Sequence, residues 1–485
     1  MQQTCRVIYQ KWEIQAVKTN LLLSSSIYVV ATFLTQGINF FALIFFARLM
    51  SPEEYGKFAI YVFWNAIVQI FIGLRTQSSI NNAYIDFGKQ NIYRFASDVS
   101  FITLGSFAVF VIPLYIFSGF SAELVGLPFL ALILGVVQAY FLYYVQLITG
   151  IYRIEENPLP YLLYSLANVF LDATLSLIWM FMLSSDKYMG KVYGSLVAAA
   201  ITGGVAALVI HRKNNFKLSV NKNYIKYALV FSLPLILHGL ASVFNGKVDA
   251  WFLMKLKSSG DAGVYSFSGN FGHVIYVLYT ACNLAFIPWY YKKKAAGRDD
   301  AVTALIKQYI GIFAFIFFGF LCLIPEVIDL LGTDAYEKAK YYVPGVALGF
   351  FFNFLYNFPT NYLFYKKRTN LIAVTTCTTF FLNFIGNYFL IKLFGIKGAM
   401  LTAALTPLSY LIINFIFAKY AVKNYEISGG VFLLPSLLIF GITVLYYVLL
   451  PYVFIRYAAV AAGIVILGSY YWKKYKSGAF AEMLQ

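Results

Sequence analysis

Apolar runs long enough to cross a lipid bilayer recur along almost the whole sequence, from Leu21 to Tyr470. The hydrocarbon core of a bilayer is about 30 Å thick, so a helix needs about 20 mostly apolar residues to span it. Of the 485 residues, 61% are hydrophobic and 12% are charged, whereas soluble domains carry about 25% charged residues. The chain is therefore predicted to be an all-α polytopic membrane protein, and a single soluble globule is excluded.

The apolar runs predict about fourteen membrane-spanning helices, because each run is close to the length that a bilayer demands. The last two spans are divided between Leu450 and Pro451, since proline disfavours helical geometry in the residue before it. No loop between the runs is long enough to form a separate domain, so the function is expected to reside within the membrane. The expected spans are 21–47, 58–74, 99–117, 127–151, 158–183, 192–210, 227–251, 264–290, 305–324, 343–365, 371–393, 398–418, 431–450 and 451–472.

The positions of lysine and arginine predict the orientation of the chain. Roughly two thirds of these side chains fall in loops that are cytoplasmic if the N-terminus is cytoplasmic, as the positive-inside rule requires. An even number of spans then places both termini in the cytoplasm. The net charge of +17 is explained by this orientation and by contact with anionic membrane lipids, and not by nucleic-acid binding.

Two pairs of matching segments indicate an internal duplication. Residues 46–56 align with 253–263, so that Arg48 meets Lys255 and Gly56 meets Gly263. Residues 194–200 align with 398–404, at the starts of the sixth and twelfth spans. Parallel repeats of this kind are typical of transporters that expose a central cavity to each side in turn. The expected organisation is an N-terminal six-helix lobe at 1–210, a basic cytoplasmic linker at 211–226, a second six-helix lobe at 227–418, and two appended helices with a cytoplasmic tail at 419–485.

The repeated motif at 47–56, with its weaker copy at 255–263 and with Asn245 and Asp249 before that copy, resembles the Wzx-type polysaccharide flippases. These belong to the multidrug/oligosaccharidyl-lipid/polysaccharide exporter superfamily. The resemblance covers nearly the whole chain. It implies that undecaprenyl-diphosphate-linked oligosaccharide repeat units, the precursors of O-antigen or capsule, pass from the inner to the outer leaflet of the bacterial cytoplasmic membrane by alternating access. The chain departs from the family at Ala250, where a basic residue often follows the aspartate.

The same resemblance implies which molecules the chain meets. These are the lipid-linked oligosaccharide, membrane lipids and, as candidate partners, a polysaccharide polymerase and assembly proteins. It implies a transporter, not an enzyme, and no cofactor. The sequence also carries no metal signature, because its four cysteines are scattered and form no C-x-x-C pair: Cys5, Cys282, Cys322 and Cys377.

Polar side chains inside four of the expected spans predict the lining of a cavity. In the seventh span, His238, Ser242, Asn245 and Asp249 are spaced by four, three and four residues and so share one helix face. The other three spans contribute Gln36, Asn39, Asn65, Gln69, Asn270 and His273. The family places these four helices around its cavity, and polar groups inside membrane proteins often mark substrate pathways. The alternative is that these side chains bond across helices and only stabilise the packing.

Charged side chains in or beside the spans are candidates for binding the diphosphate or a coupling ion. Arg75 ends the second span on the cytoplasmic side and Lys247 lies in the seventh, and His238 and His273 could add positive charge. Their alternative roles are orientation for Arg75, snorkelling for Lys247 and packing for the histidines. Asp172, in the middle of the fifth span, is either a proton-binding group or a structural acid that is kept neutral or bonded to Asn168.

Two other functions compete with the flippase. A multidrug exporter of the same superfamily often carries an acid in its first span, and 21–47 contains none. A membrane enzyme acting on lipid-linked sugars would need a catalytic constellation at the interface, and the expected outer loops contain no histidine. ATP-driven transport is also unsupported, because no Gly-Lys pair is followed by Ser or Thr as in a P-loop.

Overall fold

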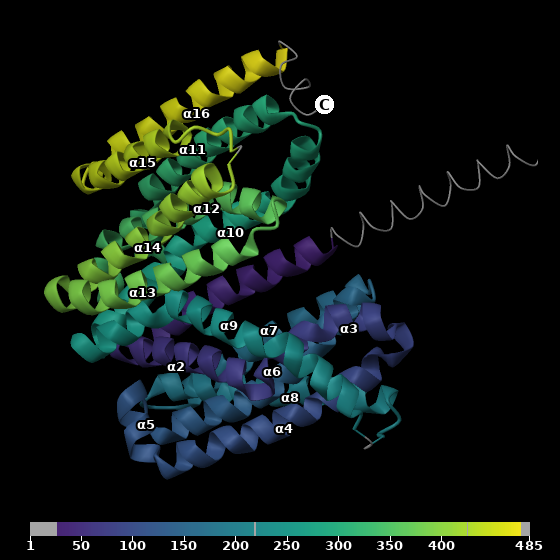
Figure 1. Cartoon of the computed structure of the whole chain (residues 1–485). Helices are drawn as coiled ribbons and strands as arrows, with labels where there is room; N and C mark the ends of the chain where they lie inside the picture. The colour runs from purple at the N-terminus through teal and green to yellow at the C-terminus, as the bar shows by residue number, and fades with distance from the viewer. Residues whose placement is uncertain (1–26, 218–219, 424, 477–485) are drawn as a thin grey trace, which may run out of the picture. The chain divides into compact units, whose positions relative to one another are not determined.

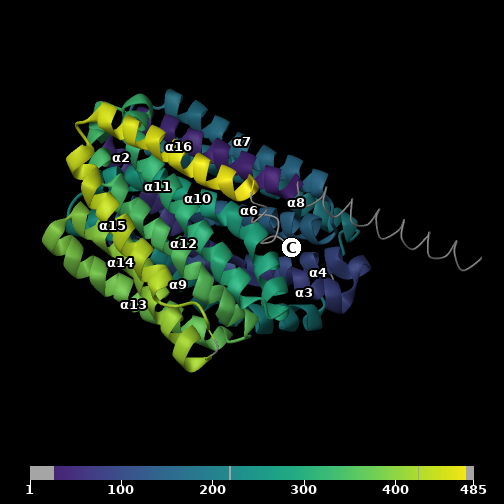
Figure 2. The ribbon, with the colours of Figure 1, turned by 90° about the horizontal axis from the view of Figure 1, so that it is seen from above.

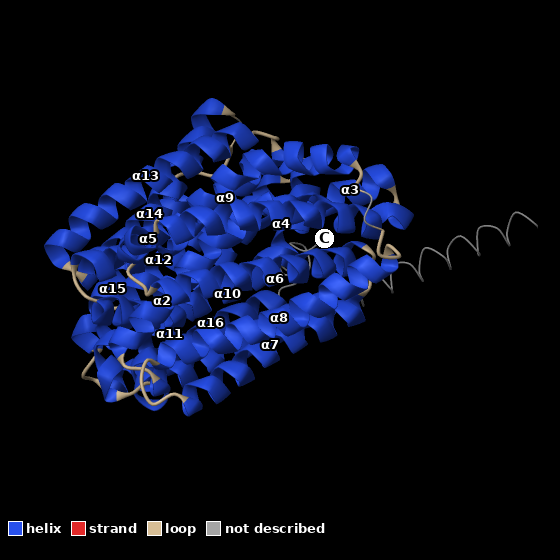
Figure 3. Ribbon diagram, turned by 90° about the horizontal axis from the view of Figure 1, so that it is seen from below, coloured by secondary structure: helices blue, strands red, loops and turns tan. Residues whose placement is uncertain are grey.

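The computed structural model describes residues 27–217, 220–423 and 425–476, and every regular element in these ranges is helical. Figure 3 shows helices joined by short loops. The all-α fold predicted from the apolar runs is confirmed. The expectations that fall on Cys5 and on the C-terminal tail beyond residue 476 lie outside the described residues.

Each of the expected spans falls on a long helix (Figure 1). Eleven of these segments are long and apolar enough to cross a membrane, and the remaining spans correspond to α10, α12 and α16. The long helices are a first helix at Ile27–Leu49, α2 (Pro52–Phe71), α4 (Ile92–Ile116), α6 (Phe129–Ile154), α7 (Pro158–Met182), α8 (Lys187–Lys213), α9 (Lys222–Leu256), α10 (Ser259–Ala295), α11 (Asp299–Leu331), α12 (Val343–Tyr365), α13 (Thr369–Phe394), α14 (Ile396–Ile416), α15 (Gly430–Leu449) and α16 (Val453–Lys476).

Short helical segments that the hydropathy pattern does not predict connect or extend the spans. They are η1 (Ile72–Ser79), α3 (Ile80–Phe87), η2 (Lys89–Asn91), α5 (Ser118–Val125), η3 (Asp334–Tyr341) and η4 (Phe417–Ala421). The second span is the most altered, because α2, η1 and α3 follow one another as a continuous apolar segment from Pro52 to Phe87. The split expected at Leu450–Pro451 is confirmed, since α15 ends at Leu449 and α16 begins at Val453.

The described residues divide into two compact units. Unit 1 contains residues 27–50 and 57–243, and unit 2 contains 51–56 and 244–476. The division between Val243 and Phe244 falls inside α9. The lobe boundaries derived from the repeat remain predictions.

The two copies of the repeated motif touch each other in unit 2. A Cβ atom added at Gly56 would collide with the backbone carbonyl of Ser259, and one added at Gly263 would collide with the carbonyl of Pro52. Glycine at both positions therefore allows the start of α2 and the start of α10 to cross with their backbones in direct contact. The neighbouring Tyr55 is buried.

The appended helices α15 and α16 lie beside α11 in unit 2 (Figures 1 and 2). Arg456 of α16 is buried and forms a bidentate ion pair with Glu326 of α11. Its Nη1 also donates to the backbone carbonyl of Cys322 at 2.6 Å. A buried charged group needs such partners, so this ion pair anchors α16 to α11.

Candidate functional site

A cavity of about 370 Å³ lies inside unit 1. It is formed by the first helix together with α2, α6, α7 and α8. Aromatic rings from Phe46, Phe58 and Tyr61 contribute to its wall. Its other polar lining side chains are Asn39, Asn65, Gln69, Gln138, Asn168, Asp172, Lys191 and Ser195.

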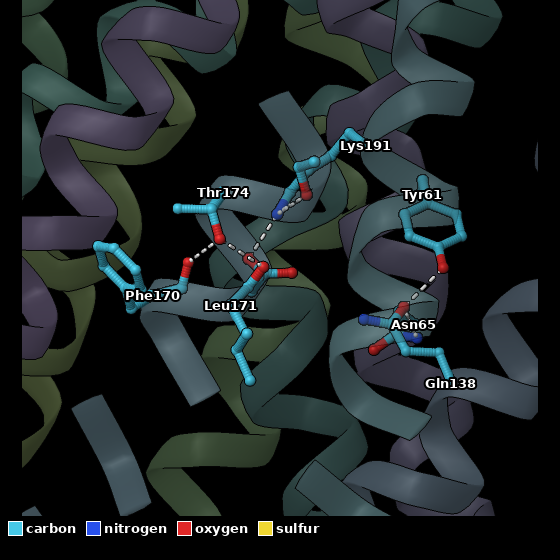
Figure 4. A network of polar contacts seen from close by, with 9 residues as sticks. Tyr61, Asn65, Gln138, Phe170, Leu171, Thr174 and Lys191 are labelled. Carbon is cyan, nitrogen blue, oxygen red and sulfur yellow. Dashed lines mark hydrogen bonds and ion pairs between the residues drawn. The ribbon is translucent and has the colours of Figure 1, made fainter. Parts of the chain in front are cut away.

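One side of the cavity is a cluster of amide side chains on α2 and α6 (Figure 4). The Tyr61 hydroxyl donates to Gln138 Oε1 at 2.6 Å, and Asn65 Nδ2 donates to the same oxygen at 3.1 Å. Asn65 Nδ2 also reaches the carbonyl of Gly135 at 3.0 Å. Because Asn65 and Gln138 are buried, these hydrogen bonds fix their orientation.

The amide cluster continues away from the cavity as a chain of hydrogen bonds. Gln69 Nε2 donates to Asn65 Oδ1 at 2.5 Å, and Gln146 Nε2 donates to Gln69 Oε1 at 2.8 Å. Gln77 Nε2 in turn donates to Gln146 Oε1 at 2.7 Å. Polar groups thus run from the cavity to η1, which is the segment that holds Arg75.

The opposite side of the cavity carries an ion pair between α7 and α8 (Figure 4). Lys191 Nζ lies 2.5 Å from Asp172 Oδ2 and 3.3 Å from the Ser176 hydroxyl. It also lies 4.8 Å from the centre of the Phe46 ring, within the range of a cation–π contact. The Lys191 side chain is 9% exposed and that of Asp172 is 27% exposed, so the carboxylate reaches the cavity.

A close approach of α8 to α7 makes this ion pair possible. A Cβ atom at Gly194 would collide with the backbone of Ser176, so glycine is required there for the two helices to lie together. Of the alternatives for Asp172, a bond to Asn168 does not occur among the described residues: Asp172 bonds to Lys191, and Asn168 Oδ1 accepts from the Thr202 hydroxyl at 2.9 Å. The role of Asp172 in ion coupling remains a prediction.

Asn39, Asn65, Gln69 and Asp172 are the residues predicted from sequence that line this cavity. Gln36 lies on the first helix and is exposed, but it is not part of the cavity wall.

Arg75 lies at a break in the second span. Gly73, Leu74 and Arg75 have φ angles of 78°, 49° and 56°, and this left-handed geometry costs a residue other than glycine about 1–3 kcal/mol. The break turns the Arg75 side chain against α9, where a Cβ atom at Gly239 would lie 2.5 Å from Arg75 Nη1. His238, the second predicted cation, is the residue before Gly239.

Unit 2 holds the other predicted residues, and Asp249 is at the centre of a hydrogen-bonded cluster there. The residue is 6% exposed, and its carboxylate accepts from the Tyr265 hydroxyl at 2.6 Å and from Asn387 Nδ2 at 2.7 Å. Asn387 also donates to Asn383 at 3.2 Å, and Asn383 donates to Thr406 at 3.0 Å. The cluster therefore ties α9 and α10 to α13 and α14.

The remaining predicted residues of unit 2 contact aromatic side chains. Asn270 donates to the Tyr55 hydroxyl at 2.6 Å, and Asn245 lies 3.4 Å from the Tyr410 hydroxyl. His273 stacks on Tyr276 with ring centres 4.8 Å apart. Lys247, by contrast, is an exposed residue of α9.

Lys191 and Gln138 are the important cavity residues that sequence reasoning missed. Lys191 lies one residue before the expected sixth span at 192–210, whereas α8 begins at Lys187 and includes it. Gln138 lies in the middle of the fourth expected span, where its polarity was an available signal. No group of His, Cys, Asp and Glu able to hold a metal ion occurs among the described residues.

The chain matches two protein-family models. The model described as "Polysaccharide biosynthesis protein" matches residues 21–294, which is more than half of the chain, and the MatE model matches 234–389. Two relatives from Haemophilus influenzae, "Uncharacterized membrane protein" and "Lsg locus putative protein 1", are each 21% identical. The matches cover 73% and 72% of this chain and 86% of each relative.

Solved structures share the fold at low sequence identity. The lipid II flippase MurJ in an inward closed conformation is 14% identical and has a TM-score of 0.72, over 94% of this chain and 99% of that one. An inward-facing multidrug resistance MATE transporter of the MOP superfamily is 14% identical and has a TM-score of 0.63, over 80% and 94%. The family model, the repeated motif and the shared fold agree, and the chain belongs to the polysaccharide biosynthesis protein family of the multidrug/oligosaccharidyl-lipid/polysaccharide exporter superfamily.

Proposed function

We propose that this protein is a flippase that moves undecaprenyl-diphosphate-linked oligosaccharide repeat units from the inner to the outer leaflet of the cytoplasmic membrane by alternating access. The observation that carries the proposal is the match to the polysaccharide biosynthesis family, combined with a polar cavity among membrane-spanning helices. A sugar cannot cross hydrocarbon unaided, because each hydroxyl would lose its hydrogen bonds to water. Side chains such as Asn65 and Asp172 replace those bonds inside the cavity.

The diphosphate requires a separate contact, which we assign to Arg75 with His238. The Arg75 side chain lies against Gly239, next to His238, on the side of the second span where the substrate is made in the proposed orientation. Neutralising Arg75 together with His238 should reduce flipping more than either single change. Wild-type rates in the double variant would show that the diphosphate is bound elsewhere.

Flipping can be measured directly with purified protein in proteoliposomes. A fluorescent undecaprenyl-diphosphate oligosaccharide placed in one leaflet should become accessible in the other, and empty liposomes should show little transfer. Replacing Asn65 and Gln69 by leucine should abolish transfer, while Asp186→Asn, outside the cavity, should retain it. If the leucine variants transfer the substrate at the wild-type rate, the substrate does not pass through this cavity.

A multidrug exporter is the second candidate, and the MatE model match at 234–389 is the observation that favours it. The unit 1 cavity favours the flippase, because its carboxylate, Asp172, is already neutralised by Lys191. An exporter of cationic drugs would instead require an acid available to its substrate. Expression in a drug-sensitive bacterial strain should therefore leave drug susceptibility unchanged, and a broad rise in resistance would favour the exporter.

We further propose that both termini are cytoplasmic and that the protein acts with a polysaccharide polymerase and assembly proteins. Under this topology the basic loop Lys366, Lys367 and Arg368 faces the cytoplasm. A cysteine introduced at Lys367 should be inaccessible to a membrane-impermeant maleimide in intact cells. Labelling of this cysteine from outside the cell would show that the loop is extracellular and that the proposed orientation is wrong.

A further inference from the structure

The wall of the unit 1 cavity combines the amide cluster with the Asp172–Lys191 ion pair, and together they carry no net charge. Among the described residues that line it, Asp172 and Lys191 are the charged ones, and they neutralise each other at 2.5 Å. The rest of the wall consists of amides, hydroxyls and apolar side chains. Its volume of about 370 Å³ falls within the range of about 300–1,000 Å³ that is common for small-molecule sites.

The hydrogen bonds inside the wall leave defined groups for a ligand. Gln138 accepts two bonds through Oε1, which leaves its amide NH₂ group to donate. The Lys191 ammonium has three protons, and its contacts with Asp172 and Ser176 use two of them. Asp172 uses Oδ2 for the ion pair, so the other carboxylate oxygen can accept.

Donors and acceptors placed side by side suit hydroxyl groups, because a hydroxyl both donates and accepts. Neighbouring hydroxyls of one sugar ring could bond to Asp172 and Lys191 together, and charge-assisted bonds of this kind are stronger than neutral ones. The rings of Phe46 and Phe58, which also line the cavity, offer an apolar surface to the C–H face of the sugar. A substrate carboxylate, by contrast, would place a second anion beside Asp172 with only Lys191 to balance both charges.

We propose that the unit 1 cavity binds an uncharged sugar ring of the lipid-linked substrate, and that the Asp172–Lys191 ion pair discriminates against sugars that carry a carboxylate. This inference rests on the proposed flippase function and specifies its substrate class. The diphosphate is not a ligand of this cavity, because Lys191 is already neutralised. It is bound by cations elsewhere, such as Arg75.

The test compares two substrates that differ in one group. Undecaprenyl diphosphate carrying a disaccharide that ends in glucose is compared with the same lipid ending in glucuronic acid, at matched reconstitution in proteoliposomes. The wild-type protein should flip the glucose form at least about tenfold faster, a preference that one uncompensated charge readily supplies. Asp172→Asn leaves a net positive cavity and should lower this ratio by about tenfold.

Lys191→Met is a second variant, for which the opposite change in the glucose-to-glucuronate ratio is expected. It leaves the Asp172 carboxylate uncompensated and should raise the glucose-to-glucuronate ratio. Asp186→Asn is the matched control, since Asp186 pairs with Lys57 at 3.9 Å on an exposed surface of unit 1, and this control should keep the wild-type ratio. Thermal unfolding and gel filtration of each variant distinguish altered selectivity from loss of fold.

The possible outcomes separate the inference from the function on which it rests. Equal flipping of both substrates by the wild-type protein would overturn the inference and leave the flippase intact. A ratio unaffected by both Asp172→Asn and Lys191→Met would do the same. Failure of the wild-type protein to flip either substrate would overturn the proposed function itself.

Discussion

Asp172 in unit 1 and Asp249 in unit 2 are both carboxylates within apolar helices long enough to span a membrane, but the protein accommodates them differently. Asp172 is paired with a lysine and keeps 27% of its side chain exposed. Asp249 is 6% exposed and accepts hydrogen bonds from the uncharged Tyr265 and Asn387. The comparison shows that Asp172 keeps part of its side chain exposed at the cavity, whereas Asp249 is enclosed by the helices that it links.

The largest effect is expected where the enclosed carboxylate is removed. Asp249→Leu would leave the Tyr265 hydroxyl and the Asn387 amide without their acceptor, at about 1–3 kcal/mol for each buried group. We expect a loss of about 3 kcal/mol in the free energy of unfolding, measured by thermal or denaturant unfolding in detergent. Stability close to that of the wild type would mean that the cluster around Asp249 is hydrated.

A smaller effect is expected when the ion pair in unit 1 is broken. Removing one partner of a fully buried ion pair costs about 3–5 kcal/mol, but Asp172 is partly exposed and can recover water. We therefore expect Lys191→Met to destabilise the protein by about 1–3 kcal/mol, less than Asp249→Leu does in the same assay. The reverse order would contradict the contrast between the two acids.

Removing both charges of the ion pair should cost less than removing one. In the double variant Asp172→Asn, Lys191→Met, no uncompensated charge remains, and replacing buried pairs in this way is often neutral. We expect stability within about 1 kcal/mol of the wild type, and a double-mutant cycle with the single variants should give a clear coupling energy. Additive effects would show that Asp172 and Lys191 act independently.

The smallest effect is expected at the exposed pair of Lys57 and Asp186. Their charged atoms lie 3.9 Å apart and both side chains are solvent-accessible, and surface ion pairs contribute about 0–1 kcal/mol. Asp186→Asn should change the free energy of unfolding by no more than about 0.5 kcal/mol. A larger change would show that the loop containing Asp186 stabilises the ends of α7 and α8.

The spans were predictable because hydrophobicity over a bilayer-sized window is a strong local signal. Even α10 and α12, which carry many polar residues and are not among the eleven most apolar spans, coincide with expected spans. The break at Gly73–Arg75 was not predictable. Leu74 and Arg75 adopt left-handed geometry that their own side chains do not favour, so the surrounding tertiary packing must impose it.

The cavity was only partly predictable. Asn65 and Gln69 stand out as polar residues inside an apolar run, and the structure places both in the wall. Lys191 was missed because a charged residue lowers the mean hydropathy, so the expected span begins only after it. The packing of α8 on α7 is what places its ammonium group beside Asp172. The pairing of Asp172 with Lys191 joins two helices, and the sequence of either one contains no information about the other.

The contact between Gly56 and Gly263 has a consequence for how such a chain could have arisen. Gly56 meets the carbonyl of Ser259 and Gly263 meets that of Pro52, and Pro52 and Ser259 are themselves equivalent in the repeat. Within unit 2, the two motif copies therefore make the same contact with each other in both directions, as equivalent residues do in an isologous contact. Fusion of two identical genes would preserve this contact from the first generation, and the two glycines would afterwards be constrained to remain small together.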